Sequence, residues 1–105
     1  MQIRIKEKSF LARAAAYMLR EDCMAVVIGK TICLWNTNRR DFLKNKKWLN
    51  HELVHVQQFK RHGFLRFLVL YLWESLRNGY CNNKFEVEAR EKENDEEPVI
   101  KTIFK

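Results

Sequence analysis

Glycine and proline are scarce in this chain of 105 residues, which contains three glycines and one proline. Together with a hydrophobic fraction of 47%, this scarcity excludes a disordered chain rich in proline and glycine. A chain of this length has material for one modest hydrophobic core. We therefore expect residues 1–105 to form a single domain, with residues 93–105 as a less ordered tail.

Cysteine is also scarce, because Cys23, Cys33 and Cys81 are odd in number and no two of them have CxxC spacing. This excludes a disulfide framework or a cysteine zinc site, and it favours a reducing compartment. Residues 1–8 alternate isoleucine with charged residues and lack the continuous apolar core of a signal peptide. We expect a cytoplasmic protein.

Acidic residues are few in most of the chain. Residues 1–85 carry 16 Lys or Arg against 6 Asp or Glu, whereas residues 86–105 carry 4 against 7. A basic surface can bind nucleic acid or anionic lipid. However, the basic residues stand in scattered pairs, without interleaved aromatic residues or a DNA-reading motif. The charge pattern therefore favours a solvated basic face over a nucleic-acid interface.

The periodicity of apolar residues predicts an α+β domain of about four helices with a β-hairpin or small antiparallel sheet. Two β-rich runs, 24–28 and 31–35, are separated by Gly29 and Lys30, which is typical of a tight hairpin. Residues 2–6 predict a short strand, residues 36–40 a polar loop and residues 41–43 a helical turn. Helices are predicted at 10–19 after Ser9, 46–62 between Asn45 and Gly63, 64–78 before Gly79, and 85–93 after Asn82 or Asn83.

The central motif is His51-Glu52-Leu53-Val54-His55, an HExxH pattern among apolar residues that favour a buried helix. His51 and His55 are four residues apart, so both imidazoles lie on one helix face and can bind one zinc ion. Glu52, on the same turn, suits a general base that acts on a water beside the metal. The alternative is that these side chains are only hydrogen-bonded on a buried face.

A zinc enzyme of this kind needs a third protein ligand, and Glu86 and Glu88 are the candidates. They follow His55 after one intervening helix and a turn, which lets the chain return toward the metal. They lie two positions apart and so point to different sides of their helix. His62 is seven residues beyond His55, roughly 10 Å along the helix axis, and is too distant to bind the same ion. Acidic residues at the start of a helix also interact favourably with the helix dipole, so both glutamates have a purely structural explanation as an alternative.

The HExxH pattern followed by ExxA, here Glu86-Val87-Glu88-Ala89, resembles the gluzincin clan of zinc metallopeptidases. The chain also resembles small uncharacterised bacterial HExxH domain proteins through residues 48–58 and 83–90, and the resemblance covers roughly residues 24–92. It implies a minimal zincin-like domain that binds Zn²⁺ through His51, His55 and Glu86, with Glu52 as the catalytic base and the hairpin as the edge sheet. Many members have an acid after ExxA, whereas this chain has Arg90, so the groups that orient the ligands stay open.

The function implied by this resemblance is hydrolysis of peptide bonds in a peptide or protein substrate by a zinc-activated water. Tyr71, Tyr80 and His62 are candidates for supporting the oxyanion, and the sequence does not choose among them. The chain has no room for a second subdomain with a specificity pocket, so one alternative is a non-proteolytic zinc-containing binding or regulatory module. Another is a basic interaction protein or membrane-surface protein in which HExxH is fortuitous.

The segment 64–78 is apolar nearly all round, yet it is too short and too charged to span a bilayer. Two interpretations remain: a buried core helix, or a helix whose second face meets a partner subunit or a membrane surface. A small domain cannot easily bury two such helices completely. A homodimer through residues 64–78 is therefore an expectation, with a membrane surface as the less favoured partner.

Overall fold

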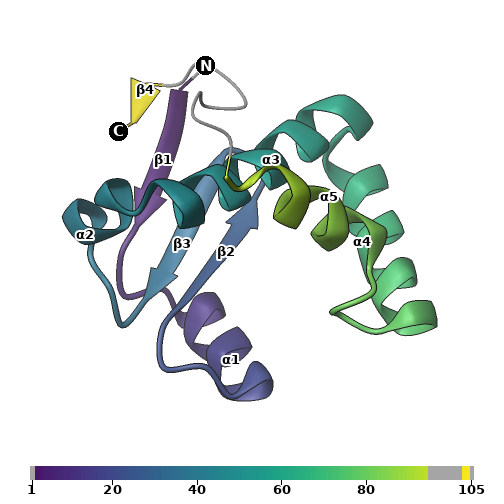
Figure 1. Ribbon diagram of the computed structural model, residues 1–105, viewed down its shortest axis with the longest axis horizontal. Coiled ribbons are helices and arrows are strands. Elements are labelled where there is room, and N and C mark those ends of the chain that lie inside the picture. Colours follow the sequence, from purple (N-terminus) through teal and green to yellow (C-terminus); the bar gives the residue numbers. More distant parts are fainter. Residues whose placement is uncertain (1, 95–102, 105) are drawn as a thin grey trace.

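The computed structural model describes residues 2–94 and 103–104 and confirms the α+β class (Figure 1). The expected less ordered tail, 93–105, lies mostly outside the described residues. In chain order the described elements are β1 (Gln2–Lys6), α1 (Phe10–Leu19), β2 (Met24–Ile28), β3 (Thr31–Trp35), α2 (Arg39–Lys44), α3 (Lys46–His62), α4 (Phe64–Asn78), α5 (Lys84–Lys92) and β4 (Ile103–Phe104).

The strands form one mixed sheet in the order β2-β3-β1-β4. The expected hairpin is confirmed: β2 and β3 are antiparallel, with Met24 opposite Trp35, and Gly29 at the turn has a φ of +64°, which glycine adopts without steric cost. β1 adds to the other edge of β3 in the parallel sense, and β4 pairs with β1, also in parallel. The sheet is mixed rather than antiparallel because α1 connects β1 to β2 at one end of the sheet and β2 then returns the chain, so that β3 runs in the same direction as β1 (Figure 1).

One helix more than expected is present, because the prediction of a polar loop over residues 36–40 is wrong at its end, where α2 begins. Asn38 caps this short helix, and its Oδ1 accepts from the Asp41 amide at 2.8 Å. Phe42 is fully buried and packs edge-on against Trp48, with ring centroids 5.1 Å apart. The predicted helical turn at residues 41–43 is present, and burial of Phe42 together with the Asn38 cap extends it to a helix of six residues.

The HExxH segment lies on α3, which is the buried central helix that the sequence predicts. Asn45 caps α3, its Oδ1 accepting from the Trp48 amide at 3.1 Å, and the helix ends before Gly63. Apolar residues of α3 pack against those of the hairpin in one core, whose fully buried members include Ile32, Leu34, Leu53 and Val56. This packing fixes α3 against the sheet and leaves a second side of α3 for α5, which runs along it.

α4 packs on α3 with one side only, and Phe67 is its one fully buried residue. A completely buried core helix is therefore the wrong interpretation of residues 64–78. Figure 1 places α4 at the edge of the molecule, with α5 between it and the sheet in this view. Among the described residues, no helix combines the length and the apolar content needed to cross a membrane.

Candidate metal centre

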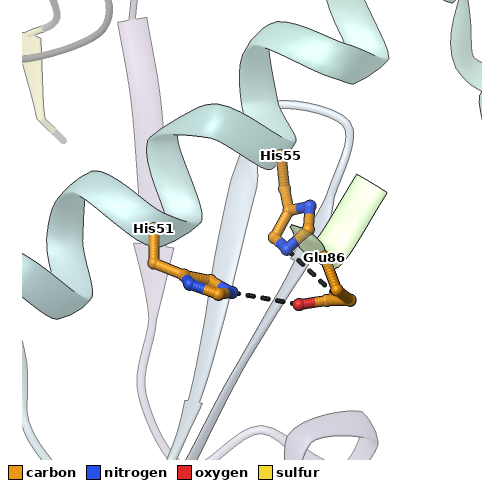
Figure 2. A group of neighbouring side chains, drawn as sticks. All are labelled: His51, His55 and Glu86. Carbon is orange, nitrogen blue, oxygen red and sulfur yellow. Dashed lines mark hydrogen bonds and ion pairs between the residues drawn. The ribbon is translucent and has the colours of Figure 1, made fainter. Parts of the chain in front are cut away.

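His51 and His55 from α3 meet Glu86 from α5 (Figure 2). His51 Nε2 lies 3.0 Å from Glu86 Oε1, and His55 Nε2 lies 3.1 Å from Glu86 Oε2. The three residues each offer one ligand atom, and these atoms lie within 4.8 Å of one another. The structure thus brings together the three residues expected as ligands, in a cluster that could hold a metal ion.

Glu86 reaches this position because of how α5 begins. The buried side chain of Asn83 caps the helix, with Oδ1 accepting from the Phe85 amide at 2.9 Å. Its amide nitrogen donates to the Tyr71 carbonyl at 3.1 Å and to Ser75 Oγ at 2.8 Å, both on α4. Asn83 therefore ties the first turn of α5, which carries Glu86, to the neighbouring helix.

The donor set fits a divalent metal such as zinc. Two imidazole nitrogens and one carboxylate, with a position left over, are the ligands of many catalytic zinc sites. Tetrahedral zinc, at about 2.0–2.1 Å from each ligand atom, holds these atoms about 3.3 Å apart. The separations of Glu86 from His51 and His55, 3.0 and 3.1 Å, are already close to that spacing.

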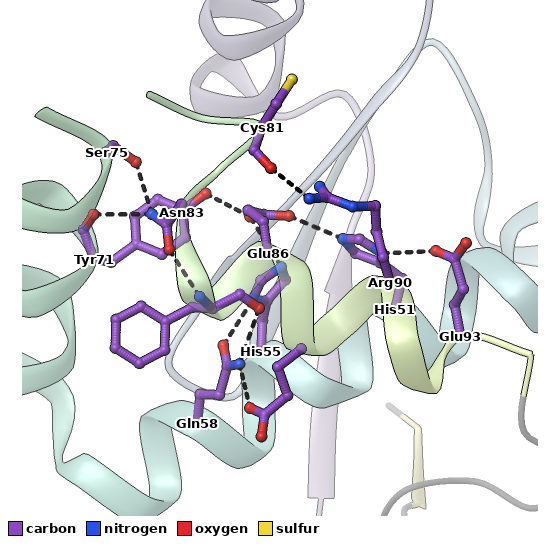
Figure 3. Close-up of polar contacts among 12 residues, drawn as sticks. His51, His55, Gln58, Tyr71, Ser75, Cys81, Asn83, Glu86, Arg90 and Glu93 are labelled. Atoms are coloured by element: carbon purple, nitrogen blue, oxygen red, sulfur yellow. Dashed lines mark hydrogen bonds and ion pairs between the residues drawn. The ribbon is translucent and has the colours of Figure 1, made fainter. Parts of the chain in front are cut away.

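The other ring nitrogen of each histidine is held by a hydrogen-bond acceptor (Figure 3). His51 Nδ1 lies 3.0 Å from Glu93 Oε2, and His55 Nδ1 lies 2.9 Å from Gln58 Oε1. A carboxylate and an amide oxygen only accept, so in each pair Nδ1–H donates. Both Nε2 atoms consequently face Glu86, which is the arrangement that metal-binding histidines adopt.

Gln58 separates the second acid of ExxA from the two histidines. Its side chain is fully buried, and its amide nitrogen donates to the Phe85 carbonyl at 3.1 Å and to Glu88 Oε1 at 2.6 Å. Glu88 therefore lies on the far side of Gln58 from His55 and supports a ligand indirectly. Glu86 alone of the two acids reaches both histidines.

Arg90, where the sequence departs from the family pattern, donates instead to the Cys81 carbonyl (Figure 3). Glu93, three residues farther along the chain, supplies the carboxylate that orients His51. The sequence reasoning missed both Gln58 and Glu93. Each has a weak signal: Gln58 is at i+3 from His55, and Glu93 is two helical turns after Glu86.

The two histidines and Glu86 shift one another's pKa values: that of Glu86 is lowered, and those of His51 and His55 are raised. Burial alone would raise the pKa of Glu86, but hydrogen bonds from His51 and His55 outweigh it and hold this pKa well below its usual range. Burial would lower the pKa of His51, but its hydrogen bond with Glu86 and the charge of Glu52 act more strongly, and the pKa rises to about 9. The pKa of His55 is raised in the same way. A metal ion would take the place of protons on the two Nε2 atoms.

Glu52, the expected general base, is buried beside this cluster. Burial raises its pKa to about 7, although the charges of His55 and His51 act to lower it. A carboxyl group with a pKa near neutrality can both accept and return a proton at neutral pH. The protonation of Glu52 therefore suits the role that the sequence predicts for it.

The three candidates for oxyanion support have different surroundings. Tyr71 donates its hydroxyl to Glu86 Oε2 at 2.5 Å, and burial with the Glu86 charge raises its pKa, which keeps that proton in place. His62 stacks on Phe67, with ring centroids 6.0 Å apart, and so has a packing role. Burial and then the charges of Glu86 and Glu52 raise the pKa of Tyr80, whose hydroxyl has no hydrogen bond to any described residue. Only Tyr80 combines a nearby position with an uncommitted hydroxyl.

Comparisons of this chain with protein-family profiles, with curated proteins and with solved structures find no match.

Proposed function

We propose that this protein is a zinc-dependent metallopeptidase with His51, His55 and Glu86 as its metal ligands. The observation that carries the proposal is that both histidines present Nε2 to Glu86 while Glu93 and Gln58 occupy their Nδ1 atoms. Zinc supplies Lewis acidity when bound, polarising a carbonyl and making a water nucleophilic at neutral pH. The same hydrogen bonds would also hold both rings on a buried helix face that has no metal, so the zinc content of the chain decides between the two.

The side chains around the ligands supply the proton transfers. Glu52, with a pKa of about 7, takes a proton from the attacking water and returns it to the leaving amine. Tyr80 donates a hydrogen bond to the carbonyl oxygen as negative charge develops on it. Tyr71 holds Glu86 in place from the side of α4.

A peptide substrate binds along β2 as an added strand. In the described part of the chain, β2 pairs only with β3, so its outer edge has free backbone donors and acceptors. β2 also contacts α3, the helix that carries HExxH. An extended peptide on that edge gains main-chain hydrogen bonds. These bonds form whatever the side chains of the peptide, which suits a domain without a deep specificity pocket.

The first test is the zinc content of the purified chain, measured by elemental analysis. We expect about one zinc per chain from the three-ligand site, and a large loss in Glu86→Ala. Glu91→Ala is the matched control, since Glu91 is an exposed acid on the same helix. Absence of zinc after refolding with the metal at neutral pH, or equal zinc in both variants, would refute the site.

The second test separates catalysis from metal binding. Glu52→Gln keeps the ligands, so zinc is retained, while hydrolysis of a peptide library falls about 10²–10⁴-fold through loss of the base. Hydrolysis that survives in Glu52→Gln contradicts the role of Glu52. A zinc-loaded wild type that cleaves no peptide in a broad library would instead support a non-proteolytic zinc module.

A further inference from the structure

The outer side of α4 is an exposed apolar face. Its members are between 59% and 82% exposed, and their spacing of three and four residues places them on one side of the helix: Leu65, Val69, Leu72, Trp73 and Leu76. We name these five residues the α4 face. The opposite side of α4 packs on the protein through Phe67 and Tyr71. The α4 face therefore contributes nothing to the core. Single exposed apolar residues are common on protein surfaces, but five on one side of a helix form a contiguous patch of the kind that marks an interaction site.

The charges beside the α4 face are all positive. Arg66 and Arg77 are exposed, and their spacing of eleven residues, three helical turns, puts both along the same border. Neither forms an ion pair with any acid in the part of the chain that the structure describes. Glu74 is the single acid of α4; it lies three residues before Arg77, outside the α4 face, and its carboxylate accepts from Asn78 and from the Lys84 amide.

We propose that the α4 face docks on the surface of an anionic lipid bilayer. The five apolar side chains enter the boundary between headgroups and acyl chains, with Trp73 at the depth that tryptophan prefers. Arg66 and Arg77 then meet lipid phosphates, and the net charge of +7 adds to the attraction. α4 lies flat on this surface, since it is too short and too charged to cross it.

Charge is what distinguishes this partner from a second copy of the chain. A two-fold antiparallel pair of α4 faces would bring the arginines of both copies along the same side of the contact. The α4 face and its border offer no acid to neutralise them, so the pair would repel where a bilayer would attract. The proposal does not depend on a bound metal, because none of these residues is part of the candidate centre.

The test is co-sedimentation of the full chain with vesicles of phosphatidylcholine, with and without phosphatidylglycerol. We expect binding to the anionic vesicles, weaker binding at high salt, and a blue shift of tryptophan emission that Trp73→Phe removes. The double variant Leu72→Glu/Leu76→Glu should bind more than about tenfold more weakly. The matched control is Tyr17→Glu/Met18→Glu, which adds the same charges at side chains of α1 that are 86% and 79% exposed.

A second variant tests the basic border without placing charge on the apolar face. Arg66→Gln/Arg77→Gln should weaken binding to anionic vesicles by about tenfold and leave circular dichroism unchanged. The proposal is overturned if the wild type binds neither kind of vesicle, or binds both equally. It is also overturned if the α1 and α4 variants lose the same affinity. A third contrary outcome is a wild type that does not bind vesicles but sediments as a dimer, which Leu72→Glu/Leu76→Glu dissociates.

Discussion

Gln58 and Glu93 determine which nitrogen of each histidine faces the candidate metal position. Gln58 holds His55 from within α3, and Glu93 holds His51 from the end of α5. Neither side chain reaches Glu86, so each would act on metal binding through the ring that it orients. Removing either should therefore weaken metal binding without removing a ligand.

Gln58→Met should lower zinc affinity about 10–100-fold. It should also cost about 1–3 kcal/mol of folding free energy, because the buried His55 Nδ1 is left without its hydrogen-bond partner. Chelator competition and thermal unfolding measure the two effects. Gln57→Met is the control, because Gln57 Oε1 is buried without a hydrogen-bond partner in the described part of the chain. Equal effects in both variants would remove the special role of Gln58.

Glu93→Ala should lower zinc affinity by about tenfold, because the His51 ring loses the acceptor at Nδ1. Glu93→Gln keeps an amide oxygen in the same place and should restore most of the affinity. Isothermal titration with zinc measures both. If alanine and glutamine lower the affinity equally, the negative charge of Glu93 matters more than the hydrogen bond that orients His51.

At the scale of elements, the link between α4 and α5 fixes the candidate site, and Asn83 makes that link with three hydrogen bonds. Asn83→Ala should destabilise the fold by about 1–3 kcal/mol, through loss of the cap and of buried partners. Its exposed neighbour Asn82 is the matched control, and Asn82→Ala should be close to neutral. Chemical denaturation of the metal-free chains measures the difference. Similar losses at both positions would contradict the assignment of the cap.

The elements that the sequence predicts well are those whose pattern is local. The hairpin 24–35, the helix 46–62 and its neighbour 64–78 have clear periodicity and end at glycine or a capping residue. Only a helical turn at 41–43 could be predicted for α2, because its full length depends on burial of Phe42 and on a hydrogen bond from its first amide to Glu7, 32 residues away. The parallel pairing of β1 with β3 is likewise a matter of tertiary contact.

The candidate site likewise has a part that local sequence predicts and a part that depends on tertiary contacts. The spacing of His51 and His55 on one helix is a local property, and it predicts two ligands directly. The sequence alone leaves Glu86 and Glu88 as alternatives, and it is the resemblance to the gluzincin pattern that predicts Glu86. Glu93 could not be predicted as the partner of His51, because their contact depends on how far α5 runs along α3 before it ends.

At the scale of the whole molecule, metal-free and zinc-loaded chains should respond oppositely to pH. The pKa of His51 rises from 6.5 to about 9 on folding, so its contribution to stability is complete below 6.5 and is lost as pH rises toward 9. Glu52, raised from 4.5 to about 7, acts in the same direction. Glu86, with a lowered pKa, contributes above 4.5 and loses its contribution as pH falls. The metal-free chain should therefore be most stable in mildly acidic solution.

Zinc reverses this trend, because an ion can bind only after the Nε2 protons leave. The rise in melting temperature on adding zinc should be small at about pH 6 and much larger at about pH 8. Calorimetry with zinc and with a chelator, at both pH values, measures the rise. His55→Asn should abolish it at either pH. A rise that is the same at both would mean that zinc binds away from these histidines.

The two sides of α4 have a consequence for which peptide bonds the proposed peptidase could reach. Tyr71 bonds Glu86 on the inner side, and the α4 face lies on the outer side. With that face on a bilayer, the centre stands about one helix diameter, about 10 Å, from the lipid. An extended chain covers that height in about three residues, at about 3.3 Å each. If the centre cleaves peptides as proposed, it would then select bonds by their distance from the membrane rather than by the side chains around them.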